Sequence, residues 1–262
     1  MIEVAGGGPA VDGDVVGIVL AAGAGRRMGG PKALLGPLAV SGRTPLALVC
    51  SWVHEAGCAR VIAVIGAEAD AVRAGLAADP TWLDAASADC GARSRSHPDD
   101  AAQEVSRPGS NPPFVDRFEA VVARCAHADA WPRWLTLVEA SDWADGMGAS
   151  LRAGLAAARR TPAASALITL VDLPDVRTAV CRRVLSAVSG TPDCLARASY
   201  LGRPGHPVVI GRDFWDAAAS AAVGDQGARA LFATTPHRLI ECGDLASGVD
   251  ADAPAPWPGA ST

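Results

Sequence analysis

A glycine-rich stretch near the N-terminus, LAAGAGRRMGGPK (20–32), holds residue types that suit the binding of phosphate groups. Its four glycines allow positive φ angles and let backbone N–H groups approach phosphate oxygens without an intervening Cβ. Arg27 and Lys32 add positive charge to the same stretch. The spacing is not that of a dinucleotide fingerprint, whose third glycine would fall at Met28, and no G-K-[ST] of a P-loop follows. The stretch predicts either an anion-binding loop or a plain turn between a strand and a helix.

Carboxylates at two other places could hold a metal ion. Asp172 ends the apolar run SALITLVD (165–172), where a buried acid costs desolvation energy unless a cation or donors meet it. It is therefore a candidate ligand for Mg²⁺, which prefers carboxylate and phosphate oxygens. Asp250 and Asp252 alternate in VDADAP and would point to one face of an extended segment, completing a site with Asp172. A solvated tail is the simpler interpretation of that pair alone, and a helix cap is the simpler interpretation of Asp175.

These residues need a scaffold, and the apolar pattern indicates one. Continuous apolar runs, typical of strands covered on both faces, predict strands at 15–22, 60–66, 134–140 and 165–172. Helices are expected at 44–55, with Thr44 and Pro45 as N-cap and first residue, and at 68–78, 146–160 and 176–188. A strand at 193–200, a short extended piece at 205–211, helices at 212–222 and 225–234 and a strand at 237–242 follow.

Strands that alternate with helices predict an α/β fold, a three-layer α/β/α Rossmann-like arrangement with a mostly parallel sheet. The loops after its strands should meet along the carboxyl edge, where such sheets bind ligands. We expect a single domain over 14–254, with frayed termini at 1–13 and 255–262. The polar stretch 79–116, rich in Pro, Gly and Ser, predicts a flexible insertion, and a helix is expected at 116–129.

Composition narrows the functional classes. The net charge of −5 over 262 residues offers no overall attraction to nucleic acid or to a membrane surface. Seven cysteines without a CxxC pair favour reduced thiols over a zinc site or a disulfide framework. The N-terminus lacks the basic and apolar regions of a signal peptide, and no run approaches the roughly 20 apolar residues of a membrane span. We expect a soluble, cytoplasmic protein.

The string L-A-A-G-x-G-x-R-M-G-x-P-K, here 20–32, resembles the nucleotidyltransferase signature. More narrowly, the chain resembles the MobA-like NTP transferases, and within them the molybdenum cofactor cytidylyltransferases. Four further stretches carry the resemblance: WADGMGASLRAGL (143–155), LVDLPDV (170–176), GRPGHPVVIG (202–211) and GDQGARALF (224–232). The final DADAP is similar to that group's D-x-D-T-P, with Ala253 in place of the threonine. Only the region 79–133 falls outside the resemblance.

The resemblance implies a nucleotide-diphospho-sugar transferase type of fold and transfer of an NMP from an NTP to a phosphorylated acceptor, with release of pyrophosphate. Arg27, Lys32 and Asp172 would be the catalytic residues, and Mg²⁺ would be held by Asp172 with Asp250 or Asp252. The nucleotide-binding residues would be Leu20, Ala21, Ala22, Gly23, Gly25, Arg27, Lys32, Gly146 and Ser150. Gly205 and His206 would face the acceptor, although His206 between Gly and Pro also suits a turn. Residues 224–229 could contact the acceptor too, but Asp225 as an N-cap explains much of that string.

Ala22 favours CTP, because members that use GTP resemble L-A-G-G here, while some uridylyltransferases share L-A-A-G. The implied acceptor is molybdopterin or the molybdenum cofactor, which a molybdoenzyme would then receive. One alternative is a sugar-phosphate nucleotidyltransferase. Another is a flavin-linked reductase of the nicotine blue oxidoreductase type, although no flavin motif is present. A third is a non-catalytic maturation factor, against which the intact Arg27, Lys32 and Asp172 argue.

Overall fold

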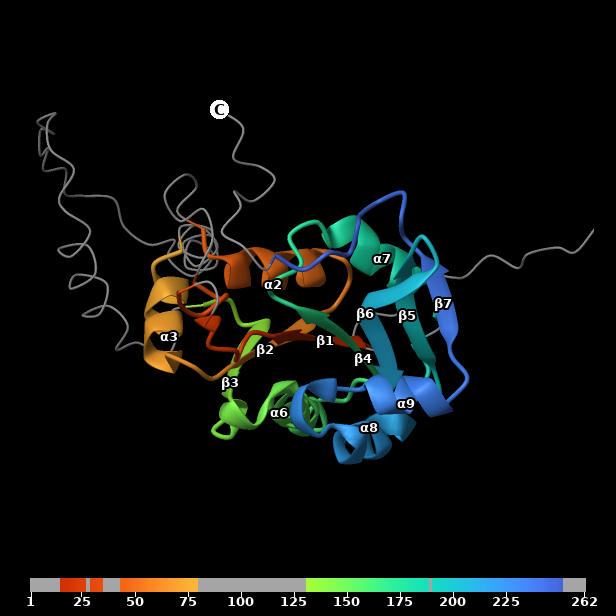
Figure 1. Cartoon of the computed structure of the whole chain (residues 1–262). Helices are drawn as coiled ribbons and strands as arrows, with labels where there is room; N and C mark the ends of the chain where they lie inside the picture. The colour runs from red at the N-terminus through yellow and green to blue at the C-terminus, as the bar shows by residue number, and fades with distance from the viewer. Residues whose placement is uncertain (1–14, 27–28, 35–42, 80–130, 189, 252–262) are drawn as a thin grey trace, which may run out of the picture.

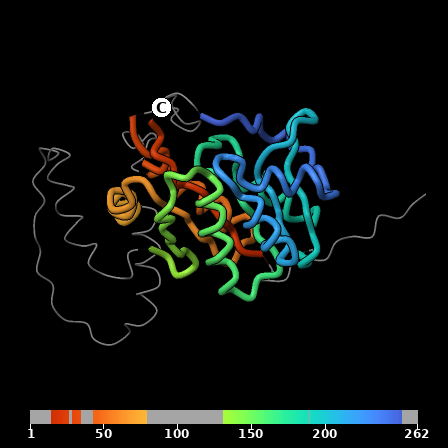
Figure 2. Tube along the Cα trace, turned by 60° about the horizontal axis from the view of Figure 1, so that its bottom comes forward, coloured from red at the N-terminus to blue at the C-terminus, as the bar shows by residue number. Residues whose placement is uncertain are grey.

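The computed structural model describes residues 15–26, 29–34, 43–79, 131–188 and 190–251. In this part of the chain a seven-stranded sheet lies between two layers of helices (Figure 1). The strand order is β3-β2-β1-β4-β6-β5-β7, so the first three strands form one half of the sheet and the last four the other (Figures 1 and 2). The expected three-layer α/β fold is confirmed.

The strands are mostly parallel, as expected. Their bounds are β1 (Val15–Leu20), β2 (Arg60–Ile65), β3 (Leu135–Glu139), β4 (Ser165–Leu170), β5 (Leu195–Tyr200), β6 (Arg203–Gly211) and β7 (Arg238–Glu241). Strand β6 is antiparallel to both neighbours, β4 and β5, whereas the other four pairings are parallel. The carboxyl ends of β1 and β4, which are hydrogen-bonded neighbours, therefore lie side by side at one edge.

Helices cover both faces of the sheet (Figure 1). One face packs against α2 (Pro45–Glu55), α3 (Ala69–Ala77) and α7 (Thr178–Ser186). The other packs against α6 (Met147–Ala158), α8 (Trp215–Ala221) and α9 (Arg229–Thr234). Three single 3₁₀ turns, η2 (Trp143–Asp145), η3 (Arg212–Phe214) and η4 (Gly224–Gln226), precede α6, α8 and α9. Each face thus has its own apolar core, and none of the described helices is long and apolar enough to cross a membrane.

The start of α2 confirms the expected cap. The Oγ1 atom of Thr44 accepts a hydrogen bond from the backbone N–H of Ala47 at 3.1 Å, and Pro45 occupies the first turn. Asp79 is buried, and its Oδ2 accepts from the backbone N–H of Thr44 at 2.7 Å. Asp79 is also the first residue of the stretch predicted to be an insertion. The rest of that stretch, the expected helix at 116–129 and both predicted frayed termini lie outside the described residues.

The bounds of helices and strands predicted from the sequence differ from the observed bounds mainly after β4. The short extended piece expected at 205–211 is the longer strand β6, which forms an antiparallel hairpin with β5. The helix expected at 225–234 is divided at Gly227, which has a φ of +52°. Asp225 is consequently no N-cap, because α9 begins after Ala228. Asp175 caps no helix either: its Oδ2 accepts from the backbone N–H and the hydroxyl of Ser247, both at 2.6 Å.

Candidate functional site

A cavity of about 630 Å³ opens at the carboxyl ends of β1 and β4. Four parts of the chain line it: the end of β1 with the glycine loop, the start of α6 with the turn before it, the end of β4, and the turn η4. The lining residues are Leu20, Ala21, Ala22, Gly23, Ala24, Gly25, Arg26, Lys32, Trp143, Ala144, Gly146, Met147, Ser150, Leu170, Val171, Asp172 and Asp225. The structure therefore brings together the described residues that were predicted to bind nucleotide. Arg27 and Asp252 lie outside the described residues.

The glycine loop folds back on itself at Gly25. This residue has a φ of +54°, and a Cβ built on it would lie 2.0 Å from the carbonyl oxygen of Gly30. The N–H of Gly30 in turn donates to the carbonyl of Gly25 at 3.4 Å. Gly23 differs, since a Cβ there would meet no atom within 4 Å. Gly25 is thus required by the backbone conformation, whereas Gly23 leaves open space on the cavity side.

The end of β1 has backbone groups with and without partners. The N–H of Ala21 donates to the Val64 carbonyl at 2.8 Å, and the carbonyl of Ala22 accepts from the N–H of Ala67 at 3.0 Å. Within the described ranges, the carbonyl of Ala21 and the N–H of Ala22 have no backbone partner. Both residues line the cavity, so these two groups are among those that a ligand there could contact.

Lys32 and Asp172 form an ion pair at the cavity wall, with Lys32 Nζ 2.8 Å from Asp172 Oδ2. The other oxygen, Asp172 Oδ1, is buried and has no hydrogen-bond partner in the part of the chain that the structure describes. The backbone N–H of Ala251 donates to the carbonyl of Asp172 at 2.8 Å, which brings the segment of Asp250 against the end of β4. A buried carboxylate oxygen without a donor, beside a second acidic segment, suits a hard divalent cation.

The start of α6 faces the cavity and is held against η4. Gly146 has a φ of +106°, and a Cβ there would lie 2.6 Å from Asp225 Oδ1. A Cβ on Gly148 would lie 2.4 Å from the carbonyl oxygen of Ala222. Close packing therefore explains both glycines. Gly146 and Ser150, which were predicted to bind nucleotide, both line the cavity.

Trp143 lines the cavity but was not predicted as a binding residue, whereas Asp225 lies in the stretch 224–229 that the resemblance linked to the acceptor and not to the nucleotide. A Cβ on Gly66 would lie 2.6 Å from the Trp143 Cβ and 2.9 Å from the Cβ of Ala22. The Cβ end of the Trp143 side chain therefore packs beside the end of β1. Asp225 reaches the cavity from η4, next to Gly146. Both residues lie inside the stretches 143–155 and 224–232, and that position was the only signal that the sequence offered for them.

Gly205 and His206, predicted to face the acceptor, lie on β6 and not among the cavity-lining residues. Gly205 packs on the ring of Tyr200, where a Cβ would come within 2.8 Å of Cε2. His206 is half-buried, with Nδ1 3.4 Å from the carbonyl oxygen of Ile168, so the alternative of a turn residue is wrong. Burial lowers the pKa of His206, which favours the neutral imidazole.

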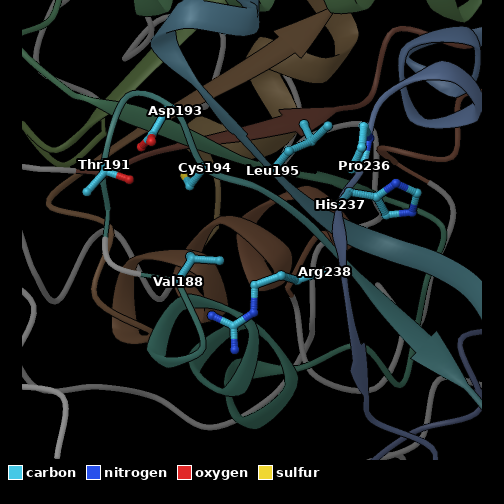
Figure 3. Close-up of a pocket in the computed structure, with 8 residues that line it drawn as sticks. All are labelled: Val188, Thr191, Asp193, Cys194, Leu195, Pro236, His237 and Arg238. Carbon is cyan, nitrogen blue, oxygen red and sulfur yellow. The ribbon is translucent and has the colours of Figure 1, made fainter. Parts of the chain in front are cut away.

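A second cavity, of about 450 Å³, lies at the starts of β5 and β7, on the edge of the sheet opposite the carboxyl ends of β1 and β4 (Figure 3). Thr191 and Asp193 stand on one side of it, and His237 and Arg238 on the other (Figure 3). Arg238 donates to the carbonyl of Ala187 at the end of α7. This cavity has neither the glycine loop nor the unbonded carboxylate oxygen of the first, which is the better candidate site.

Comparisons with known proteins identify the family of the chain. A family model described as the MobA-like NTP transferase domain matches residues 17–94 and 113–239. Nicotine blue oxidoreductase of Paenarthrobacter nicotinovorans is 32% identical over 248 residues, which cover 91% of this chain and 92% of that protein.

Two solved structures show the same fold. An Rv0371c homologue from Mycobacterium sp. strain JC1 superposes with a TM-score of 0.58 at 22% identity, covering 92% of this chain and 91% of the other. A nucleotidyl transferase from Methanothermobacter thermautotroptrophicus superposes with a TM-score of 0.54 at 18% identity, covering 91% and 92%. At these identities the two structures support the fold alone.

Proposed function

The chain belongs to the MobA-like NTP transferase family, and we propose that it transfers CMP from CTP to a phosphorylated acceptor, the molybdenum cofactor, and releases pyrophosphate. The observation that carries this proposal is the arrangement of Lys32 and Asp172. Their ion pair lies at the wall of a cavity formed by the glycine loop, and one Asp172 oxygen there is buried without a donor. A triphosphate with its metal ion needs this combination of a cation, a carboxylate and backbone N–H groups.

The proposed reaction is a displacement at phosphorus. A phosphate oxygen of the acceptor attacks the α-phosphorus of CTP, and a new P–O bond forms. The bond from the α-phosphorus to the bridging oxygen breaks, and pyrophosphate leaves with that electron pair. No covalent enzyme intermediate is needed, so the protein acts by alignment and charge stabilisation. Lys32 and Arg27 neutralise the phosphates, and the N–H groups of Gly23 and Gly25 help to hold them.

Asp172, together with Asp250 or Asp252, is proposed to hold Mg²⁺. The fit rests on the unbonded Asp172 Oδ1 and on the hydrogen bond from Ala251 to the Asp172 carbonyl, which aligns the second acidic segment. When bound, Mg²⁺ supplies neutralisation of the charge that develops on the triphosphate. Lys32 would then exchange its contact with Asp172 for one with a phosphate oxygen.

The carbonyl of Ala21 and the N–H of Ala22 are proposed to contact the base. CTP is the proposed nucleotide because of the resemblance at Ala22, where members that use GTP resemble L-A-G-G and cytidylyltransferases resemble L-A-A-G. The cytidylylated cofactor would pass to a molybdoenzyme.

One assay tests the reaction. The full chain is incubated with Mg²⁺, the molybdenum cofactor and each NTP in turn, and pyrophosphate release is measured. We expect release with CTP and none when the acceptor is omitted. Absence of release with every NTP would overturn the proposal. Release that requires a sugar phosphate in place of the molybdenum cofactor would instead identify a sugar-phosphate nucleotidyltransferase.

A second candidate is an oxidoreductase, which is favoured by the name of the relative that is 32% identical along 91% of the chain. Its test is bleaching of nicotine blue by a reduced nicotinamide cofactor, with and without added flavin. The visible absorption of the purified chain also shows whether a flavin is bound. We expect neither bleaching nor flavin, and the Asp172→Ala variant serves as a control because a redox reaction has no need of that carboxylate.

A further inference from the structure

The segment that follows β7, residues 243–251, returns to the candidate site along the edge of the sheet. It leaves β7 and runs back past α7 (Figure 1). Strand order places β5 and β6 between β7 and β4, so the segment crosses their ends before it meets Asp172. Its last six residues belong to no helix or strand, and Ser247, Val249 and Asp250 among them are exposed. We call residues 243–251 the strap.

Asp175 holds the strap at its middle. Its Oδ2 accepts hydrogen bonds from both the backbone N–H and the hydroxyl of Ser247, each at 2.6 Å. The Ser247 hydroxyl in turn accepts from the N–H of Val249 at 3.3 Å. Between them, Gly248 has a φ of +66° and lies against Tyr200, where a Cβ would come within 2.2 Å of the ring. One carboxylate oxygen therefore orders the exposed part of the strap.

Packing does not explain why this residue is an aspartate. The other oxygen of Asp175, Oδ1, is buried, and no donor meets it among the described residues. Leaving a buried carboxylate oxygen without a donor costs free energy. An asparagine could offer an oxygen to Ser247 at a smaller cost, because an amide is uncharged. The negative charge of Asp175 therefore points to a role beyond stability of the fold.

The strap ends at the proposed metal ligands. The N–H of Ala251 donates to the carbonyl of Asp172 at 2.8 Å, and Ala251 lies between Asp250 and Asp252 in the sequence. Asp172 and Asp175 belong to the same turn after β4, so this turn holds the strap at two points. The path of the stretch that carries Asp250 is thus set by the turn that carries Asp172.

We propose that Asp175 is a positioning residue: through Ser247 it fixes the strap against the end of β4 and thereby places Asp250 for the metal ion. This inference rests on the proposed function, to which the metal ion belongs. A carboxylate on an unattached loop loses conformational freedom when it binds a cation, whereas a carboxylate on a fixed loop has lost that freedom already. Asp175 therefore acts on the affinity for metal and not on the transfer step.

The experiment measures metal binding without turnover. Mn²⁺ is the probe, because it takes the same oxygen ligands as Mg²⁺ and is detected directly by electron paramagnetic resonance. It is titrated into the full chain without nucleotide, and hydrogen exchange of the backbone amides over 247–251 is followed by mass spectrometry. Asp175→Asn removes the charge of the contact, and Ser247→Ala removes its hydroxyl. The matched controls are Asp216→Asn in α8 and Ser186→Ala at the end of α7.

Asp175→Asn should weaken Mn²⁺ binding by about 10- to 100-fold, as expected for loss of a group that orients a metal ligand. Ser247→Ala should weaken it by at least about threefold, since one of the two hydrogen bonds to Asp175 remains. Amide exchange over 247–251 should be faster in both variants, and both controls should behave as wild type. In the double variant the two losses of affinity should not add, because both substitutions break the same contact.

Absence of Mn²⁺ binding to wild type, or wild-type affinity in Asp175→Asn, would overturn the proposal. Wild-type affinity in Ser247→Ala together with a loss in Asp175→Asn would also overturn it, because Asp175 would then meet the metal ion directly. If Asp175→Asn does not fold by circular dichroism, Ser247→Ala decides in its place.

Failure of the proposed function has a different signature. In that case no NTP releases pyrophosphate, while the Mn²⁺ titration and the exchange rates still report on the contact of Asp175 with Ser247. Where release does occur, Asp175→Asn should need more Mg²⁺ for half of its maximal rate but approach the wild-type rate at saturating Mg²⁺. A general loss of structure would lower the rate at every Mg²⁺ concentration and would contradict a positioning role.

Discussion

Lys32 and Asp172 are 140 positions apart in the sequence, yet Lys32 Nζ lies 2.8 Å from Asp172 Oδ2. The side chains remain 23% and 18% exposed, so water screens the pair and it contributes little to folding, at most about 1 kcal/mol. A weak pair is easily exchanged for other partners. This contact therefore couples the residue proposed to meet phosphate with the residue proposed to meet the metal ion.

Lys32→Gln should lower the rate of pyrophosphate release by about 10²- to 10³-fold, because one charge that stabilises the transition state is removed. The same variant should bind Mg²⁺ more tightly in the absence of nucleotide, since Asp172 loses its cationic competitor. Steady-state kinetics and metal titration measure the two effects. Unchanged turnover would show that Lys32 does not act on the phosphates.

Asp172→Ala should abolish turnover and leave the fold intact. The carboxylate has one weak ion pair and one unbonded oxygen, so its loss removes the proposed metal ligand but few stabilising contacts. Activity and thermal unfolding are compared with those of Asp193→Ala, which removes a carboxylate from the second cavity. Full activity in Asp172→Ala would make the metal assignment wrong.

Gly25→Ala should weaken nucleotide binding. The left-handed backbone costs about 1–2 kcal/mol for a residue with a Cβ, and that Cβ would also meet the Gly30 carbonyl at 2.0 Å. Gly23→Ala should leave the free energy of unfolding unchanged, because its Cβ meets nothing within 4 Å. Chemical denaturation and CTP titration of both variants check this. A Gly25→Ala protein with wild-type affinity for CTP would contradict a structural need for glycine there.

Trp143 should report nucleotide binding by its fluorescence. It is the tryptophan that lines the cavity among the described residues, and its side chain packs beside Ala22 at the proposed base site. Addition of CTP should change the emission of wild type, and the change should disappear in Trp143→Phe. The matched control is Trp215→Phe, which alters a buried tryptophan of α8 that donates a hydrogen bond to the carbonyl of Ile210 on β6. A response that survives in Trp143→Phe would place the nucleotide elsewhere.

Ionisation of Glu241 should make the free energy of unfolding depend on pH in the acidic range. Its carboxylate accepts hydrogen bonds from the Ser199 hydroxyl and from the backbone N–H groups of Gly202, Gly243 and Leu201, and these lower its pKa from 4.5 to about 2. Because the pKa is lower in the folded state, the stabilisation is complete above pH 4.5 and is lost as the pH falls toward 2.

Glu241→Gln cannot ionise, so the difference in unfolding free energy between wild type and this variant should shrink as the pH is lowered from 5.5 to about 3. Urea denaturation at several pH values measures the difference. A constant difference across this range would show that the Glu241 carboxylate is not preferentially stabilised in the folded protein.

Local patterns predicted most of the scaffold. Strands β1, β2 and β4 are buried along most of their length, so they appear as continuous apolar runs. The Thr-Pro start of α2 is a local signal that needs no tertiary contact. The start of β6 carries no such signal. Its residues Arg203 and Pro204 are exposed and are held in the strand by pairing with β5, which a search for apolar runs does not detect.

The candidate site, too, was predicted only in part. The glycine loop was recognisable from its four glycines, and Asp172 was recognisable as an acid that ends an apolar run. The contact of Lys32 with Asp172 and the approach of Asp225 to Gly146 depend on tertiary structure alone. A parallel sheet brings the carboxyl ends of distant strands to one edge, and strand order, not sequence distance, decides which side chains meet there.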